Sequence, residues 1–491
     1  MGKIGGFLEY GRKDSVDISP KQRICNFAEF HLPINEEERK KQASRCMDCG
    51  VPFCQFGQEI AGMSSGCPLH NMIPEWNDLL YRGNYDEALK RLLLTNPFPE
   101  FTSRVCPAPC EKACTCSLHG DAVTICENEK FLIEYGFKQQ IIKAKKTSKR
   151  SGKKIAIVGS GPSGLATAWQ LNRRGHEVTV YERSDRAGGL LMYGIPNMKL
   201  DKQYVNRRIA LMEEEGITFV LSTSIDTLEA ADKLKSEYDA VVLAVGASKP
   251  RDLSVVNREA KGIYFAVDYL QAVTKHVLDA DDAKPTIDAN NKHVLVIGGG
   301  DTGNDCVGTA IRQHCASVMQ LEMMPELPST RQENNPWPEW PKVKKTDYGQ
   351  EEAIAVFGQD PRVYEATIKE FVKNEVGEVC QAIIVDVAWQ LDENKRMQPV
   401  HVANSERVVD CDLVFIAAGF VGVESAVSNA FMLDQTERGV LATTDGTATA
   451  IDGVFVTGDA KRGQSLVVWA MQEGKNTARA VDTYLMGYSN L

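Results

Sequence analysis

The cysteines of this chain are concentrated near its beginning, at spacings that suit metal coordination. Ten of the fourteen lie between residues 25 and 126. Seven of these form two spaced groups, Cys46-Met-Asp-Cys49 with Cys54 and Cys67-Pro68, and Cys106-Pro-Ala-Pro-Cys110 with Cys114. Structural zinc favours two matched C-x2-C pairs, and the second pair is missing here. Cysteine runs that include Cys-Pro are typical of iron–sulfur proteins, so we predict iron–sulfur clusters rather than zinc or inert core thiols.

Two four-ligand clusters need eight ligands, and these groups supply seven. Cys116, Cys126 and Glu129 lie nearby in the sequence and are the candidates for the eighth position. Cys25 stands alone and is interpreted as a small buried hydrophobe. The first ten residues contain no apolar signal-peptide core. We therefore expect a cytoplasmic chain, in which thiols stay reduced and no disulfide framework forms.

A glycine-rich turn follows a short apolar strand beyond the cysteine-rich region. Ile155-Ala-Ile-Val158 runs into Gly159-Ser-Gly161-Pro162-Ser163-Gly164, and a helical stretch then leads to a second strand that ends at Glu182. The glycines allow close approach of the backbone to a pyrophosphate, and the helix N-terminus favours its charge. Glu182 is placed to accept hydrogen bonds from a ribose hydroxyl. Together these elements predict a dinucleotide site.

The same pattern occurs a second time. His293-Val-Leu-Val-Ile297 precedes Gly298-Gly-Gly300-Asp301-Thr302-Gly303, and a helix and a strand again lead to an acid, Glu322. Two such units in one chain predict two bound dinucleotides. Tight strand–helix packing without a ligand is the alternative interpretation of each unit.

The residues around the first unit indicate that it binds FAD. A second glycine turn at Gly188-Gly189-Leu190 follows Glu182, and an apolar strand near the end of the chain leads into Gly458-Asp459. A carboxylate there can bind a ribityl hydroxyl, and a helix that starts near Ser465 can point its N-terminus at a flavin carbonyl. Because these segments flank the second unit, we expect one FAD domain that is interrupted by an NAD(P)H-binding domain.

These elements predict an α/β fold with two tandem Rossmann-like domains, the second inserted in the first, after a helical domain. The expected domains are a helical iron–sulfur domain at 1–145, an FAD-binding domain at 146–285 and 419–491, and an NAD(P)H-binding domain at 286–418. The similar segments 239–246 and 412–419 are expected to mark the crossings, which places Gly419 at the NAD(P)H site. The net charge of −10 argues against nucleic acid as a partner, and no apolar stretch suits a membrane span.

The acid of the second unit bears on the choice between NADH and NADPH. Glu322 can accept a hydrogen bond from the 2′-OH of NADH, whereas it repels the 2′-phosphate of NADPH. Arg331 lies in a proline-rich loop that follows and is placed to neutralise such a phosphate. Because no arginine pair follows Leu321, we expect a preference for NADH.

Five stretches of the chain resemble a known family closely. They are Cys46–Cys54, Cys67–Asn77, Thr95–Glu111, Tyr193-Gly-Ile-Pro196 and Asn335-Pro-Trp-Pro-Glu-Trp-Pro341. Together they are similar to the small (beta) subunits of glutamate synthase along nearly the whole chain. The cluster domain and the nucleotide domains are also similar to part of dihydropyrimidine dehydrogenase and to transhydrogenase-type ferredoxin:NADP oxidoreductase subunits.

The resemblance implies two [4Fe-4S] clusters whose ligands cross between the cysteine groups. One cluster would take Cys46, Cys49, Cys54 and Cys114, and the other Cys67, Cys106, Cys110 and Glu129. One departure bears on Cys67, because residues 56–66 separate it from Cys54 where some relatives have three residues.

The resemblance also implies a function. NAD(P)H gives a hydride to FAD, the clusters carry single electrons, and a large (alpha) subunit with FMN and glutaminase sites converts 2-oxoglutarate and glutamine to two glutamates. Hydride transfer between stacked rings depends on position, so no acid–base catalytic residue is predicted. The alternatives are a subunit that reduces ferredoxin or serves a pyrimidine dehydrogenase, a flavin disulfide reductase, and a non-enzymatic iron–sulfur sensing module.

Overall fold

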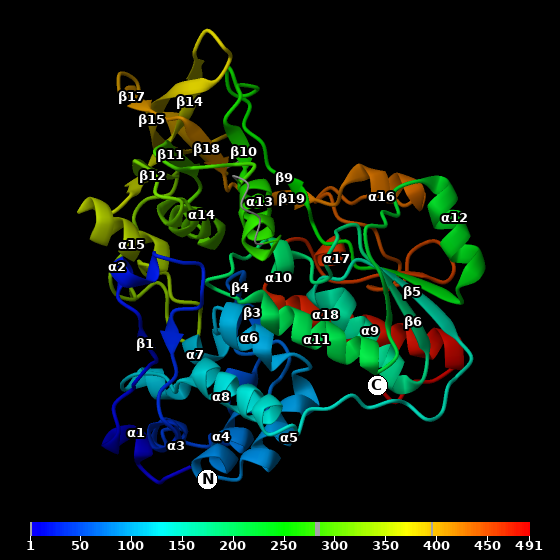
Figure 1. Ribbon diagram of the computed structural model, residues 1–491. Coiled ribbons are helices and arrows are strands. Elements are labelled where there is room, and N and C mark those ends of the chain that lie inside the picture. The colour runs from blue at the N-terminus through cyan, green and yellow to red at the C-terminus, as the bar shows by residue number, and fades with distance from the viewer. Residues whose placement is uncertain (1, 280–284, 394–395) are drawn as a thin grey trace.

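The computed structural model describes residues 2–279, 285–393 and 396–491, which form a helical part and two α/β parts (Figure 1). The helical part is built mainly from α3 (Glu36–Ser44), α4 (Ile73–Tyr81), α5 (Tyr85–Thr95), α6 (Pro99–Val105) and α8 (Ile125–Lys138). Its helices begin at recognisable start signals: Asn35 caps α3 by accepting a hydrogen bond from the Glu38 amide, and proline lies in the first turn of α4 and α6. No helix in the described ranges has both the length and the apolar composition of a membrane span.

The first α/β part contains a five-stranded parallel sheet in the order β20-β8-β5-β6-β7. Its strands are β5 (Lys154–Val158), β6 (Glu177–Tyr181), β7 (Thr218–Val220), β8 (Ala240–Leu243) and β20 (Val454–Val456). α9 (Pro162–Arg174) packs against α18 (Val467–Met486), the last helix of the chain. Because β20 pairs with β8, segments from both sides of the second glycine-rich unit build this part.

The second α/β part has the same architecture. Its parallel sheet has the order β10-β18-β11-β12-β13. The elements are β10 (Ile263–Phe265), α13 (Ala266–Asp279), β11 (His293–Ile297), α14 (Asp301–Arg312), β12 (Ser317–Glu322), α15 (Tyr348–Phe357), β13 (Arg362–Tyr364) and β18 (Leu413–Ile416).

The expected boundary between the two α/β parts lies between residues 285 and 286, and the structure places it earlier in the chain. β10 pairs in parallel with β18, so residues 263–279, with α13, belong to the second part. The crossings are instead two short antiparallel strands, β9 (Lys249–Pro250) and β19 (Phe420–Gly422). A three-residue strand such as β10 is too short to show a hydrophobic period, which is why the sequence pattern does not assign it.

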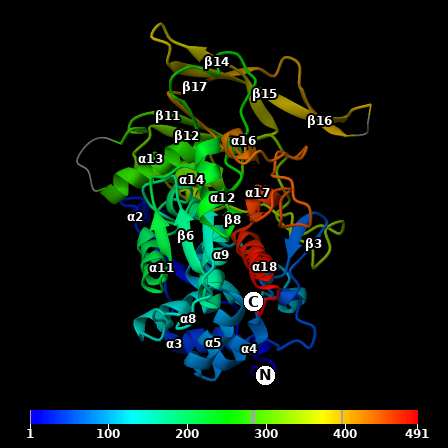
Figure 2. The same ribbon diagram turned by 90° about the vertical axis from the view of Figure 1, so that its right-hand side faces the viewer.

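An antiparallel sheet extends from the second part and has no counterpart in the predicted fold. It contains β14 (Ala366–Lys373), β15 (Val379–Leu391), β16 (Met397–His401) and β17 (Arg407–Asp410). Figure 2 shows β16 projecting from the body of the molecule.

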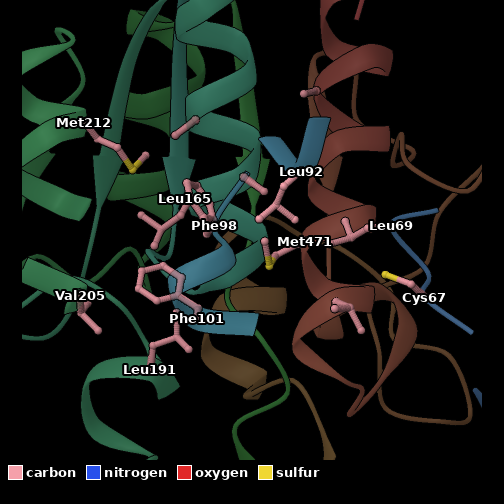
Figure 3. Packing of buried hydrophobic residues seen from close by; sticks show 14 of the residues in the cluster. Cys67, Leu69, Leu92, Phe98, Phe101, Leu165, Leu191, Val205, Met212 and Met471 are labelled. Carbon is pink, nitrogen blue, oxygen red and sulfur yellow. The ribbon is translucent and has the colours of Figure 1, made fainter. Parts of the chain in front are cut away.

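The helical part and the first α/β part share one hydrophobic core. A single cluster of buried residues includes Phe98, which precedes α6, Phe101 of α6, Leu165 of α9 and Met471 of α18 (Figure 3). Burial of large apolar side chains is the dominant favourable term in such packing. The position of the cysteine-rich part relative to the first dinucleotide unit is therefore set by a continuous core.

Candidate functional site

The predicted cysteine ligands line two cavities in the helical part. The inner cavity is lined by Cys67, Cys106, Cys110, Cys126 and Glu129, together with Val468 of α18. The outer cavity is lined by Cys46, Cys49, Cys54, Cys114 and Cys116. Ile73 and Ile125 line both cavities, so one layer of side chains lies between them. The seven cysteines are thus divided into the same two sets that the family resemblance implies.

Residues 57–66 form a hairpin that leaves the cysteine-rich region and returns to it. Its strands are β3 (Gln58–Ile60) and β4 (Met63–Ser65), and at its neck the Cys67 amide donates a hydrogen bond to the Cys54 carbonyl. Gly66 has a φ of 73°, and a Cβ there would lie 2.3 Å from the Phe53 carbonyl oxygen. The closed neck therefore requires glycine and keeps Cys67 beside Cys54 despite the insertion.

The thiols of the two cavities fit a cluster better than a single metal ion. All fourteen cysteines are free, and burial raises the pKa of Cys46 to about 12 and that of Cys67 to about 11. Such thiols keep their protons unless a metal displaces them. Four thiolates on zinc would hold their sulfur atoms roughly 3.8 Å apart. Each cavity is lined by at least four cysteine or carboxylate donors, the number of ligands that a four-iron cluster takes.

The candidates for the eighth ligand are separated by the two cavities. Cys116 lines the outer cavity, which already has four predicted ligands. Cys126 and Glu129 both lie on α8 and line the inner cavity. The Glu129 carboxylate accepts hydrogen bonds from Asn96 and Thr102, and burial raises its pKa to about 8. The structure therefore leaves Glu129 and Cys126 as the residues that can complete the inner set.

The first glycine-rich turn has the geometry that a pyrophosphate site requires. Gly159 has a φ of 103°, and a Cβ there would lie 2.4 Å from the Ala244 carbonyl oxygen. At Gly161 a Cβ would meet no atom within 4 Å, so the turn is open in front of α9, which begins at Pro162 and Ser163. Gly189 lies against this turn, with its Cβ position 2.9 Å from the Gly161 Cα. The two predicted glycine turns are therefore in contact.

A serine that the sequence analysis did not single out joins Glu182 to these turns. The Glu182 carboxylate accepts hydrogen bonds from the backbone amide and the hydroxyl of Ser160. The Gly188 amide donates a 2.8 Å hydrogen bond to the same hydroxyl. Glu182 is thus held at the first turn. Gly164 lies in the first turn of α9, and exposed Leu190 begins α10 (Leu190–Tyr193).

The C-terminal segment reaches the same place. A Cβ at Gly458 would lie 2.5 Å from the Ser163 hydroxyl, and Ser465 donates a 2.6 Å hydrogen bond to Asp459. Burial raises the pKa of Asp459 to about 6. The Thr457 hydroxyl is fully buried and has no hydrogen-bond partner among the described residues. A buried hydroxyl and a half-buried carboxyl beside an open glycine turn fit a polar ligand such as FAD.

The second glycine-rich turn repeats this geometry. Gly298 has a φ of 124°, and a Cβ at Gly300 would meet no atom within 4 Å. α14 begins with Asp301, Thr302 and Gly303. The Glu322 carboxylate faces the turn, because a Cβ at Gly299 would lie 1.9 Å from one of its oxygens. The residues fit a second dinucleotide, with Glu322 beside its expected phosphates and ribose.

The other two predicted NAD(P)H residues are arranged differently. Arg331 donates hydrogen bonds of 3.0 Å to the carbonyl oxygens of Asn335 and Glu339, so its guanidinium is bound to its own loop. Gly419 lies at a crossing between the two α/β parts. The amide of the next residue, Phe420, donates a 3.0 Å hydrogen bond to Gln464 of the first part.

Buried amide side chains support the second turn and were not predicted. Gln320 donates a 2.9 Å hydrogen bond to the Gly298 carbonyl and accepts one of 3.0 Å from Gln350. The sequence does carry one sign of this support. Gln320 is a polar residue within the otherwise apolar strand that leads to Glu322, and a buried polar side chain needs a hydrogen-bond partner.

Three cysteines that line neither cavity bear on predictions made from the sequence. Cys25 is exposed, which corrects its interpretation as a buried hydrophobe. Cys306 and Cys315 are buried in the core of the second α/β part and are free. They do not form the redox pair that a flavin disulfide reductase uses.

Comparisons with known proteins agree with this arrangement. Residues 23–141 match the family described as dihydropyrimidine dehydrogenase domain II, 4Fe-4S cluster, and residues 112–236 and 153–340 match pyridine nucleotide-disulphide oxidoreductases. A solved structure of Mycobacterium tuberculosis FprA in complex with NADPH has a TM-score of 0.52 at 16% identity, over 68% of this chain and 85% of FprA. That likeness shows the fold of the dinucleotide-binding parts.

Similar sequences extend over the whole chain. It is 49% identical to the glutamate synthase (NADPH) small chain of Bacillus subtilis, over 100% of both chains. It is 42% identical to that of Mycobacterium tuberculosis, over 100% of this chain and 98% of the other. It is also 46% identical to glutamate synthase (NADH) of Saccharomyces cerevisiae, where it spans only 22% of that protein's length. With this identity over full-length relatives, the chain belongs to the family of glutamate synthase small chains.

Proposed function

We propose that this chain is the electron-input subunit of a glutamate synthase. It takes electrons from NAD(P)H at FAD and passes them through two [4Fe-4S] clusters to a large subunit with FMN and glutaminase sites. That subunit converts 2-oxoglutarate and glutamine to two glutamates. Family membership and the two kinds of cofactor site support this proposal.

The observation that carries the proposal is the order of the sites in space. α18 begins just after Asp459 and Ser465, and its Val468 lines the inner cavity. Lys475 of α18 donates a 2.8 Å hydrogen bond to the Thr95 carbonyl. Burial raises the pKa of Cys67, and the charge of Lys475 opposes that rise. The inner cavity therefore lies between the expected flavin site and the outer cavity.

The residues of this chain bind and orient the cofactors. Bound FAD supplies the exchange between the two electrons of a hydride and the single electrons of iron–sulfur centres. Gly161 leaves room for its pyrophosphate, and Asp459 would accept hydrogen bonds from its ribityl chain. α18 has no side-chain cap at Leu466, so its first amides are free to face the flavin. Position, rather than a protonating side chain, is what these residues provide.

Electrons leave at the outer cavity in this proposal. Val51, between the predicted ligands Cys49 and Cys54, is 76% exposed, and Leu118, just after Cys116, is 46% exposed. Exposed apolar residues next to a redox centre suit a surface that a partner subunit covers. We propose that the large subunit docks here.

Anaerobic purification and analysis test the proposal. We expect a yellow-brown protein with one FAD and about eight irons per chain, since two [4Fe-4S] clusters contain that number. NADH or NADPH should bleach the flavin absorption and drive reduction of an artificial dye. A colourless protein, or one that NADH and NADPH both leave oxidised, would contradict the proposed function.

A further inference from the structure

The hairpin of residues 57–66 contacts both α/β parts, although it belongs to the iron–sulfur part. Two adjacent serines of β4 are buried, Ser64 at 8% exposure and Ser65 at 1%. Its turn lies at Ala61 and Gly62, which both have positive φ values and suit a tight antiparallel connection. Figure 1 shows β3 and β4 at the level where the helical part meets the α/β parts, and Figure 2 shows β3 at one edge of the molecule.

One side of the hairpin is fixed to the expected flavin site. Trp469 of α18 donates a 2.6 Å hydrogen bond from its indole nitrogen to the Ser64 hydroxyl. Glu59 forms an ion pair with Arg462 of α17 (Asp459–Arg462), and the Arg462 guanidinium lies 3.9 Å from the centre of the Trp469 ring. These contacts close a ring between the hairpin, α17 and α18. The helix that begins with Asp459 is part of that ring.

The other side of the hairpin is fixed to the proline- and tryptophan-rich loop of the second α/β part. Ser65 donates a 2.9 Å hydrogen bond to the Pro338 carbonyl. The ring of Phe53, next to Cys54, lies 4.7 Å from the ring of Trp337. The neck and the second strand of the hairpin therefore hold this loop against the iron–sulfur part.

The loop follows β12, which ends at Glu322 beside the second glycine turn, and it is cross-linked internally. Asn335 is 2% exposed, donates hydrogen bonds to Glu339 and the Trp340 carbonyl, and accepts one from the Lys342 amide. Arg331 donates to the Asn335 and Glu339 carbonyls. A network with satisfied polar groups moves as one body. Fixing Pro338 therefore also fixes Arg331.

We propose that the hairpin of residues 57–66 is a clamp that positions the NAD(P)H-binding part relative to the flavin-binding part. Ser65 binds the NAD(P)H-binding part, and Ser64 and Glu59 bind the flavin-binding part. The hairpin therefore sets the alignment from which a hydride is transferred. Ser64, Ser65 and Trp469 are positioning residues in this proposal. Its kinetic consequence rests on the proposed function, whereas its structural consequence does not.

Amide hydrogen exchange of the holoprotein tests the structural consequence. Ser65→Ala removes the hydroxyl that holds Pro338, and we expect exchange in residues 331–342 to accelerate at least fivefold. Trp469→Phe keeps a ring under Arg462 but removes the indole donor, and should accelerate exchange in residues 58–65. Met63→Ala changes an exposed side chain of the same strand and should alter neither segment. Unchanged exchange in both segments of the first two variants would overturn the clamp.

Steady-state kinetics with NADH, NADPH and a dye tests the alignment. Ser65→Ala should lower kcat at least threefold while KM, the FAD content and the iron content stay at wild-type values, because binding groups are untouched and geometry is loosened. An unchanged kcat together with faster exchange would overturn the positioning role. If the wild-type protein oxidises neither nucleotide, the proposed function fails, and the exchange experiment still decides whether the clamp exists.

Discussion

The backbone amide of Cys67 donates a 2.7 Å hydrogen bond to the carbonyl oxygen of Cys54. Cys54 lines the outer cavity and Cys67 lines the inner one, so this bond joins the two sets of predicted ligands. The bond also closes the neck of the hairpin. An insertion between two ligands is therefore compatible with an unchanged cluster region, because the added residues leave and return at the same point.

Replacing Cys106 by serine should remove about half of the iron, since one of two four-iron clusters loses a ligand. The FAD content should stay at its wild-type value, because the residues expected to bind FAD belong to another part. Iron analysis and flavin absorption measure both. Cys25→Ser, at an exposed cysteine outside both cavities, is the matched control. A Cys106→Ser protein with full iron content would refute the assignment.

The eighth ligand should be Glu129 rather than Cys126. Glu129→Ala should change the electron paramagnetic resonance spectrum of the inner cluster and make its iron easier to remove, while the outer cluster keeps its signal. Cys126→Ala should leave both signals intact. The reverse outcome would transfer the role to Cys126, which lines the same cavity.

Asp459→Asn should lower the FAD content and stabilise the FAD-free protein at neutral pH. Burial raises the pKa of Asp459 from 3.8 to about 6, so the folded state holds this proton more tightly than the unfolded state. The folded state therefore loses stability as the pH rises from about 4 to 6, by at most about 3 kcal/mol. The asparagine variant avoids this loss.

Thermal unfolding of FAD-free protein checks the sign of this effect. The Asp459→Asn variant should be more stable than wild type at pH 7, and the difference should vanish near pH 4. Asp434→Asn, at an exposed carboxyl, should show no such pH-dependent gain. Equal stabilities of Asp459→Asn and wild type at pH 7 would mean that the pKa of this carboxyl is not raised in the folded protein.

The wild-type protein should prefer NADH to NADPH, and Glu322→Ser should reduce that preference. The carboxylate faces the second glycine turn, and a phosphate charge about 4 Å away would cost roughly 4 kcal/mol before relaxation. The ratio of kcat/KM for the two nucleotides measures the preference. A wild-type preference for NADPH that falls in Arg331→Ala would instead give the deciding role to Arg331.

Local patterns made much of the site predictable. The glycine turn at Gly161 and the acid at Glu182 follow one another along the chain, so the sequence alone brings them into one strand–turn–helix–strand unit. Contacts between distant segments were not predictable in this way. Trp469 meets Ser64 from the other end of the chain, and the pairing of β10 with β18 depends on the finished sheet. Such features leave no period or spacing in the sequence.

The most direct test of the electron-input role combines this protein with the large subunit of a glutamate synthase, 2-oxoglutarate, glutamine and either NADH or NADPH. Glutamate formed and nucleotide oxidised are measured in the same anaerobic reaction. We predict two glutamates for each nucleotide oxidised, and none when either subunit is omitted. Nucleotide oxidation that reduces a dye or ferredoxin but yields no glutamate with the large subunit would contradict this role.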